Sequence, residues 1–185
     1  MVFAKDLRAG THFILEGKIF RVLNYQIAKT AQSKAIVRVK VQNLETGAVL
    51  EKSFKSEDQV ESAYVETKPL EYLYHDGDGY HFMDQQTYEQ IAIPEELLGD
   101  NTGFMKENMV ANIIFYEDRP LGIELPPSVE LRVVETEPGF KGDTVSGASK
   151  PARLETGRTI NVPLFVEAGD LIKVDTRYGK YLERA

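Results

Sequence analysis

The chain of 185 residues is 42% hydrophobic and 28% charged and carries a net charge of −7, the composition of an ordinary globular protein. No apolar run approaches the ~20 residues of a membrane-spanning helix, so we expect no membrane association. The absence of cysteine excludes disulfides, zinc–thiolate clusters and thiol nucleophiles. Charges within residues 1–8 occupy the place of a secretory signal's apolar segment, so we expect a cytoplasmic protein.

Charge divides the chain into three segments. Residues 1–65 contain ten Lys/Arg and seven Asp/Glu, residues 66–127 contain three and thirteen, and residues 128–185 contain nine of each. The changes in net charge coincide with Pro69 and with the pair Pro126-Pro127, and prolines of this kind are typical of turns and linkers. We therefore predict three domains with the boundaries 1–65, 66–127 and 128–185.

The first segment contains a basic β-hairpin. Apolar residues recur near every second position over residues 20–27 and 36–44, which predicts two paired strands with one apolar face. Between Lys18 and Lys55 the sequence has eight cations and only two carboxylates, a local net charge of +6 in an acidic protein. A polyanion is the expected partner of this face, and the hairpin tip at residues 29–34 is the first candidate site.

The second segment predicts a hairpin and one short helix. Strands are expected over residues 70–74 and 80–83 around a turn at 76–79, and again over 109–116 and 121–125. Pro94 and Gly99 bracket a helix of residues 94–98, since proline suits a helix start and glycine a helix end.

The third segment continues the β pattern. Its expected strands cover residues 129–135, 159–163, 171–175 and 178–182, with a loop over 136–152. Several strands of five to eight residues at short spacing favour small barrels, so the chain is predicted to be all-β.

An enzymatic interpretation finds little support. Asp76, Asp78 and Asp84 lie near His75 and His81, but their spacing lacks the acidic twelfth position of a calcium loop and fits a solvated turn better. The sequence has neither a nucleophile motif nor a phosphate-binding loop. We therefore predict a protein that is not an enzyme and that needs no metal or other cofactor.

The third segment carries the most specific motif. Residues 150–157 read Lys-Pro-Ala-Arg-Leu-Glu-Thr-Gly, and residues 160–169 read Ile-Asn-Val-Pro-Leu-Phe-Val-Glu-Ala-Gly. This resembles the signature of the bacterial elongation factor P family, with every fixed position filled. Residues 135–144 and 72–90 are similar to the loop and the middle domain of the same family, and the similarity runs from Phe3 to Ala185.

The resemblance implies a fold and a role. The family has an SH3-like (KOW-type) N-terminal domain and two OB-fold domains in an L-shaped outline similar to tRNA. It binds the ribosome beside peptidyl-tRNA and promotes peptide-bond formation at stalls such as consecutive prolines. The partners implied are therefore the ribosome, the acceptor end of peptidyl-tRNA, ribosomal RNA and the exit-site codon of mRNA, and we expect a monomer.

The resemblance also implies site residues. The hairpin tip would lie beside the CCA end of peptidyl-tRNA, with the family's modified position at Gln32 and RNA contacts from its neighbours: Lys29, Thr30, Ala31, Ser33, Lys34 and Arg38. A loop of Gly142, Asp143 and Thr144 would approach the exit-site codon, and Tyr181 and Arg184 would contact the tRNA backbone.

The tip departs from the family pattern. Much of the family has Lys-Pro-Gly-Lys-Gly-Gly there, with a covalent extension on the middle Lys or on an Arg in its place. Glutamine cannot accept such an extension, so either the protein works unmodified or Lys29 or Lys34 serves instead. We hypothesise that it works unmodified, because neither lysine lies at the tip itself. Two other functions remain open: a divergent paralogue acting on other stalls, and a general binder of single-stranded nucleic acid.

Overall fold

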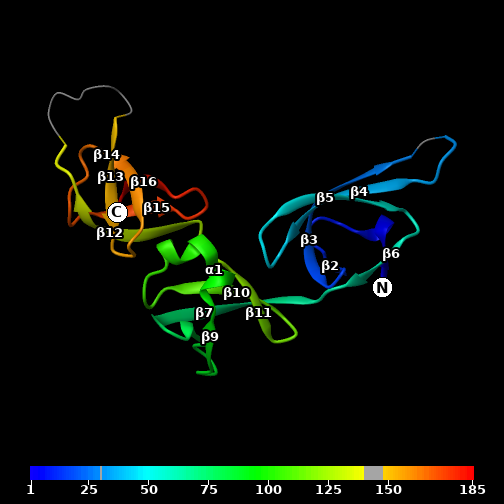
Figure 1. Ribbon diagram of the computed structural model, residues 1–185, viewed down its shortest axis with the longest axis horizontal. Coiled ribbons are helices and arrows are strands. Elements are labelled where there is room, and N and C mark those ends of the chain that lie inside the picture. Colours follow the sequence, from blue (N-terminus) through cyan, green and yellow to red (C-terminus); the bar gives the residue numbers. More distant parts are fainter. Residues whose placement is uncertain (30, 140–147) are drawn as a thin grey trace. The chain divides into compact units, whose positions relative to one another are not determined.

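The computed structural model describes residues 1–29, 31–139 and 148–185 and is almost entirely β (Figure 1). Its strands form one six-stranded and two five-stranded sheets, which confirms the predicted all-β class with three β domains. In these residues no helix has the length and apolar character needed to cross a membrane. By packing, the chain divides into two compact units, residues 1–68 with 113–122 and residues 69–112 with 123–185.

The first sheet has the order β1-β6-β2-β3-β4-β5. Its elements are β1 (Val2–Phe3), the 3₁₀ helix η1 (Ala4–Asp6), β2 (His12–Leu15), β3 (Lys18–Ala28), β4 (Ile36–Asn43), β5 (Val49–Lys55) and β6 (Gln59–Ser62). The long β3–β4 hairpin, in blue in Figure 1, is the one predicted from the sequence. Val37, Val39 and Val41 of β4 are buried while the residues between them are more exposed, because successive side chains of a strand point to opposite faces.

The middle sheet has the order β11-β10-β7-β8-β9. Its strands are β7 (Val65–Asp76), β8 (Gly79–Met83), β9 (Gln90–Ile93), β10 (Val110–Tyr116) and β11 (Arg119–Glu124). The predicted short helix is present as α1 (Glu95–Leu98), with Pro94 at its N-cap and Gly99 after its last residue at φ 55°. The 3₁₀ helix η2 (Gly99–Phe104) follows it directly.

The third sheet has the order β14-β13-β12-β15-β16. Its strands are β12 (Ser128–Thr136), β13 (Ser149–Leu154), β14 (Thr159–Pro163), β15 (Leu171–Asp175) and β16 (Lys180–Arg184). The loop predicted through Ala152 is shorter than expected, since β13 already begins at Ser149. The sequence does not show this strand as an alternation of polar and apolar residues, because a lysine, Lys150, occupies a core-facing position. Lys150 is 6% exposed, and its ammonium donates a hydrogen bond to the Glu137 carbonyl at 2.6 Å.

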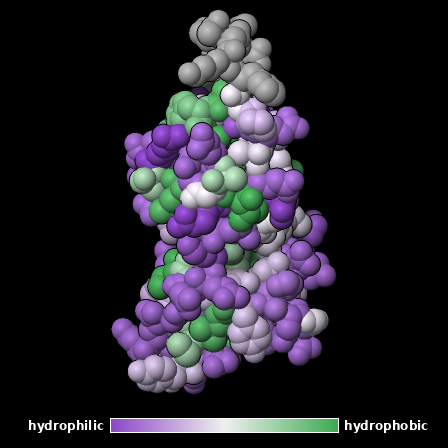
Figure 2. Space-filling view, turned by 90° about the vertical axis from the view of Figure 1, so that its left-hand side faces the viewer, coloured by the Kyte–Doolittle hydropathy of each residue, from purple (hydrophilic) through white to green (hydrophobic). Residues whose placement is uncertain are grey.

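The surface is predominantly polar on the face that Figure 2 presents. Hydrophilic residues cover most of it, and hydrophobic side chains form small separate groups. Scattered apolar residues of this kind are normal on a protein surface and do not indicate an apolar docking area.

Candidate nucleic-acid interface

The candidate interface is built on the β3–β4 hairpin and its neighbour β5. Antiparallel pairing places Gln26 opposite Arg38 and Asn24 opposite Lys40, and the register shifts by one residue between Val22 and Asn24. Such a bulge increases the local twist of a hairpin.

Two cations share the outer face of this hairpin. Arg38 and Lys40 are both exposed on β4, and with Asn24, Gln26 and Glu51 they line a shallow depression of about 160 Å³. Lys55 pairs with Ile36 in the same register and therefore points to this outer face as well. The outer face thus combines positive charge with amide groups, both of which suit phosphate and sugar contacts, and carries one carboxylate, Glu51, opposite Lys40.

The cations of the segment do not all lie on this face. Lys52 pairs with Val39, which is buried, so Lys52 lies on the core-facing side of the sheet. Its ammonium lies 5.3 Å from the centroid of the Phe20 ring. The local charge of +6 therefore overstates the positive charge available to one ligand, because sequence position alone does not assign a face to β5.

The described residues of the tip are solvent-exposed. Lys29, Ala31, Gln32, Ser33 and Lys34 are all exposed, and Thr30 lies outside the described residues. The base of the tip is held to the turn between β5 and β6. The Ser56 amide donates to the Ala35 carbonyl at 2.9 Å, and the Lys34 ammonium forms an ion pair with Glu57 at 3.0 Å.

An aromatic core supports the hairpin from below. The Phe13 ring stacks on Phe20 with centroids 5.6 Å apart and meets Phe54 edge-on at 6.0 Å. Farther toward the tip, the Arg8 guanidinium covers the Tyr25 ring at 4.9 Å. These contacts hold the stem in place, so the hairpin presents its tip from a packed base.

The structure brings the two C-terminal candidates together around Phe165. The Arg184 guanidinium lies 4.8 Å from the Phe165 ring centroid, donates to the Phe165 carbonyl at 2.8 Å and pairs with Asp170 at 3.3 Å. Tyr181 meets the same ring edge-on at 6.4 Å. Sequence reasoning missed Phe165, although its position in the Val-Pro-Leu-Phe run was a usable signal.

The remaining candidates, Gly142, Asp143 and Thr144, lie outside the described residues.

The carboxylates of the enzymatic alternative stabilise turns. Asp76 accepts hydrogen bonds from the His81 ring at 2.8 Å and the Asp78 amide at 2.9 Å, and these bonds lower the pKa of the Asp76 carboxyl. Asp84 accepts from the Gln86 amide at 2.8 Å. Across the described part of the chain, no group of three or more His, Cys, Asp or Glu side chains is arranged to hold a metal ion.

Known families match this chain in all three parts. Residues 4–60 match the profile "Elongation factor P (EF-P) KOW-like domain", residues 65–123 match "Elongation factor P (EF-P) OB domain", and residues 129–184 match "Elongation factor P, C-terminal". These matches define the class as a translation factor built from KOW-like and OB domains, and not an enzyme.

Full-length relatives specify the family. The chain is 51% identical to elongation factor P of Dictyoglomus turgidum over 185 residues and 47% identical to that of Acetivibrio thermocellus over 184 residues, with 100% of both chains covered in each case. The chain belongs to the elongation factor P family, which confirms the resemblance seen in the sequence. It is a translation elongation factor, and the family implies interaction with the ribosome and with tRNA.

Solved structures agree on the fold. "Eukaryotic translation initiation factor 5A from Methanococcus jannaschii" matches with a TM-score of 0.55 and 18% identity, covering 67% of this chain and 91% of that one. An initiation factor 5A family protein from Naegleria fowleri gives a TM-score of 0.53 and 11% identity, covering 67% and 96%.

Proposed function

We propose that this elongation factor acts in the cytoplasm on ribosomes stalled at sequences such as consecutive prolines. It binds beside peptidyl-tRNA and holds the tRNA acceptor end in a reactive position. The observation that carries the proposal is the exposed hairpin tip, with Gln32 flanked by Lys29 and Lys34, on a packed stem whose outer face carries Arg38.

Positioning suits a protein without catalytic side chains at its candidate interface. Proline is a constrained nucleophile, so the reacting groups rarely adopt the productive geometry, and a factor that holds one of them supplies orientation without proton transfer. An orientation effect of ~3 kcal/mol corresponds to a rate increase of about a hundredfold. Lys29, Lys34 and Arg38 fit phosphate contacts, and Ala31 and Ser33 allow the backbone a close approach to RNA.

The rest of the proposed interface follows the resemblance to the family. Gly142, Asp143 and Thr144 approach the exit-site codon, and Tyr181 and Arg184 contact the tRNA backbone. The net charge of −10 in residues 66–127 opposes general binding of single-stranded nucleic acid, which needs a basic groove. The acceptor-end role is therefore preferred to a general RNA or DNA binder.

The test is peptide synthesis on a Pro-Pro-Pro message with and without the protein. We expect acceleration by the wild type and a loss of most of it in a Lys29→Ala/Lys34→Ala double variant. Lys180→Ala, which removes an exposed cation from β16, serves as the matched control and should retain activity. No acceleration by the wild type would leave the paralogue that serves other stalls. Loss of activity in Asp78→Ala with ribosome binding retained would support a hydrolase instead.

We further propose that the tip works without modification, since Gln32 cannot carry the extension that the family places there. The measurement is the intact mass of protein isolated from its native host, followed by peptide mapping. The sequence mass alone is expected. An added mass on residues 29–34 would contradict this and would identify Lys29 or Lys34 as the substitute.

A further inference from the structure

The second compact unit contains a groove that the proposed function does not use. It has a volume of about 470 Å³, within the range of ligand sites. We call it the Tyr72 groove and define it by six of its lining residues: Tyr72, His75, Tyr80, Lys106, Glu107 and Glu155. All six belong to residues 69–112 and 123–185, which form one packed unit.

Three rings form an aromatic wall in this groove. His75 and Tyr80 stack with centroids 4.7 Å apart and planes 19° from parallel. Tyr72 packs against Tyr80 with centroids 5.8 Å apart. Tyr80 is only partly buried and His75 is exposed, so a planar group has an accessible ring face on which to stack.

The Tyr72 hydroxyl is available to a ligand. Tyr72 is 6% exposed, and within the described residues its hydroxyl makes no hydrogen bond. Every fully enclosed side-chain nitrogen or oxygen in that part of the chain has a partner, so the Tyr72 oxygen must reach the surface. Because Tyr72 lines the groove, we infer that its oxygen is exposed there. An accessible hydroxyl with no protein partner, on an otherwise buried and therefore fixed side chain, is available to hydrogen-bond a ligand atom.

The carboxylates around the groove determine the charge of that ligand. Lys106 is paired with Glu155 at 3.3 Å, whereas Glu107 is exposed and, among the described residues, has neither a hydrogen bond nor an ion pair. The excess charge of the groove is therefore negative. This opposes a phosphate backbone and favours a cation.

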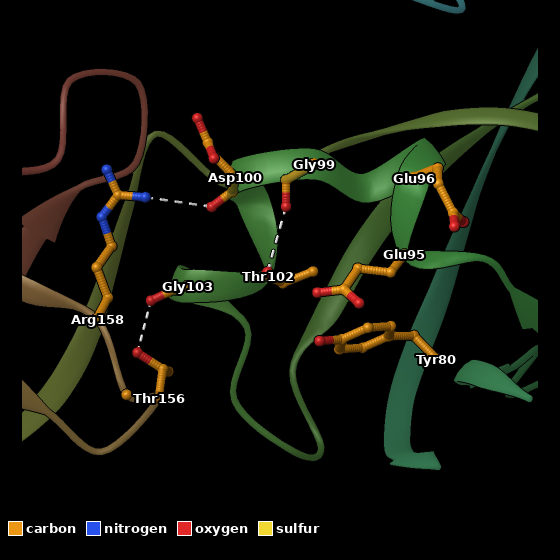
Figure 3. A pocket seen from close by; sticks show the side chains of 10 residues that line it. Tyr80, Glu95, Glu96, Gly99, Asp100, Thr102, Gly103, Thr156 and Arg158 are labelled. Carbon is orange, nitrogen blue, oxygen red and sulfur yellow. Dashed lines mark hydrogen bonds between the residues drawn. The ribbon is translucent and has the colours of Figure 1, made fainter. Parts of the chain in front are cut away.

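A neighbouring pocket extends the negative charge. It shares Tyr80, Thr102 and Thr156 with the Tyr72 groove and adds Glu95 and Glu96. Figure 3 shows the Tyr80 hydroxyl and the Glu95 carboxylate pointing into the same space. Its one cation, Arg158, is directed at the Asp100 carbonyl at 3.3 Å. Carboxylates thus line both pockets that Tyr80 borders.

We propose that the Tyr72 groove binds an arginine side chain of a basic protein segment. The guanidinium stacks on the ring faces of Tyr80 and His75 and donates hydrogen bonds to the Tyr72 hydroxyl and the Glu107 carboxylate. Arginine fits better than lysine because its planar guanidinium, with five donors, can stack on a ring and donate several hydrogen bonds at the same time. An ammonium cannot do both. This adds a protein partner to the role on tRNA, in a different domain from the hairpin.

The test is titration of the full-length ¹⁵N-labelled protein with the peptide acetyl-Gly-Arg-Gly-Arg-Gly-amide, followed by NMR. We expect saturable shifts centred on Tyr72, Tyr80 and Glu107, and binding several-fold weaker for the corresponding lysine peptide. Tyr72→Phe, which removes only the hydroxyl, should weaken arginine-peptide binding by about three- to tenfold. Its matched control is Tyr74→Phe on the same strand, outside the groove.

Charge is tested separately from the hydroxyl. Glu107→Gln should weaken binding by about three- to tenfold, whereas Glu89→Gln, an exposed carboxylate outside the groove, should not. The proposal is overturned if shifts spread over the acidic surface without saturating, or if lysine and arginine peptides bind equally well. It is also overturned if the Tyr72 and Glu107 variants behave like their controls, or if an oligouridylate occupies the groove in preference to the peptide.

Discussion

The guanidinium carbon of Arg158 lies 4.4 Å from the centroid of the Phe104 ring. Phe104 is the last residue of η2, the 3₁₀ helix that follows α1. Its side chain is 3% exposed and packs into the core of the third sheet, not of the middle sheet. Arg158 also donates to the Asp100 carbonyl, as Figure 3 shows, and Thr156 donates to the Gly103 carbonyl at 2.5 Å. The turn between β13 and β14 therefore fastens η2 to the third sheet.

Replacing Arg158 tests this attachment. Arg158→Ala removes a cation–π contact and a hydrogen bond to a carbonyl, so we expect a loss of about 1–2 kcal/mol of unfolding free energy. Urea denaturation measures it. Arg153→Ala is the control, because Arg153 forms only a surface ion pair with Glu135 and should cost at most about 0.5 kcal/mol. Equal losses in the two variants would show that the Phe104 contact contributes little.

A glycine pair in the middle hairpin gives a second stability prediction. Gly79 has φ 125°, and a Cβ there would lie 2.6 Å from the Ile93 carbonyl oxygen, whereas a Cβ at Gly77 would meet nothing within 4 Å. Gly79→Ala combines backbone strain with a clash against backbone, so a loss of about 2–4 kcal/mol is expected.

Gly77→Ala is the matched control, two residues away in the same turn, and should stay within about 0.5 kcal/mol of the wild type. Thermal unfolding by circular dichroism compares the two. A Gly79→Ala protein as stable as Gly77→Ala would mean that β9 moves aside at little cost.

Local pattern predicted much of this fold. The alternation of valines with polar residues in β4 and the proline and glycine on either side of α1 depend on nearby residues only, so the sequence predicts both elements. It does not predict the placement of Lys52 and Lys150, because each depends on a partner outside its own strand. Lys52 faces the core through its pairing with Val39, and Lys150 is drawn inward by the Glu137 carbonyl.

The candidate site shows the same division. Charge and hairpin position make Lys29, Lys34 and Arg38 candidates, and the family resemblance adds Gln32. The sequence does not predict the Tyr72 groove, because its lining joins residues of β7 and β8 to residues before β10 and after β13, and no sequence spacing indicates that they meet.

The Lys34–Glu57 pair distinguishes a structural role from a binding role for Lys34. Both side chains are about 70% exposed, so the ion pair contributes little to stability. Glu57→Gln should change the free energy of unfolding by less than about 0.5 kcal/mol and leave Pro-Pro-Pro synthesis intact, since Lys34 keeps its charge. Lys34→Ala should be equally stable but less active, and its tRNA or ribosome binding should depend less on salt. Reduced activity in Glu57→Gln alone would show that the ion pair positions the tip.

Alkaline titration tests Tyr72. Burial, with smaller contributions from Tyr80 and Glu107, raises the pKa of the Tyr72 hydroxyl from 10.0 to about 12. The folded protein therefore favours the protonated phenol. The contribution of the protonated Tyr72 hydroxyl to stability is complete below pH 10 and is lost as the pH rises from 10 toward 12, where the unfolded chain ionises first.

Urea denaturation at about pH 9 and about pH 11 should therefore show a fall in stability that is smaller in Tyr72→Phe than in the wild type. Burial also raises the pKa of Tyr116, so ultraviolet titration of the folded Tyr72→Phe variant should show a smaller late tyrosinate step than the wild type. Tyr88→Phe, at a side chain 72% exposed, should keep both the step and the wild-type fall. A late step of undiminished amplitude in Tyr72→Phe would assign it to other tyrosines and would contradict a raised pKa at Tyr72.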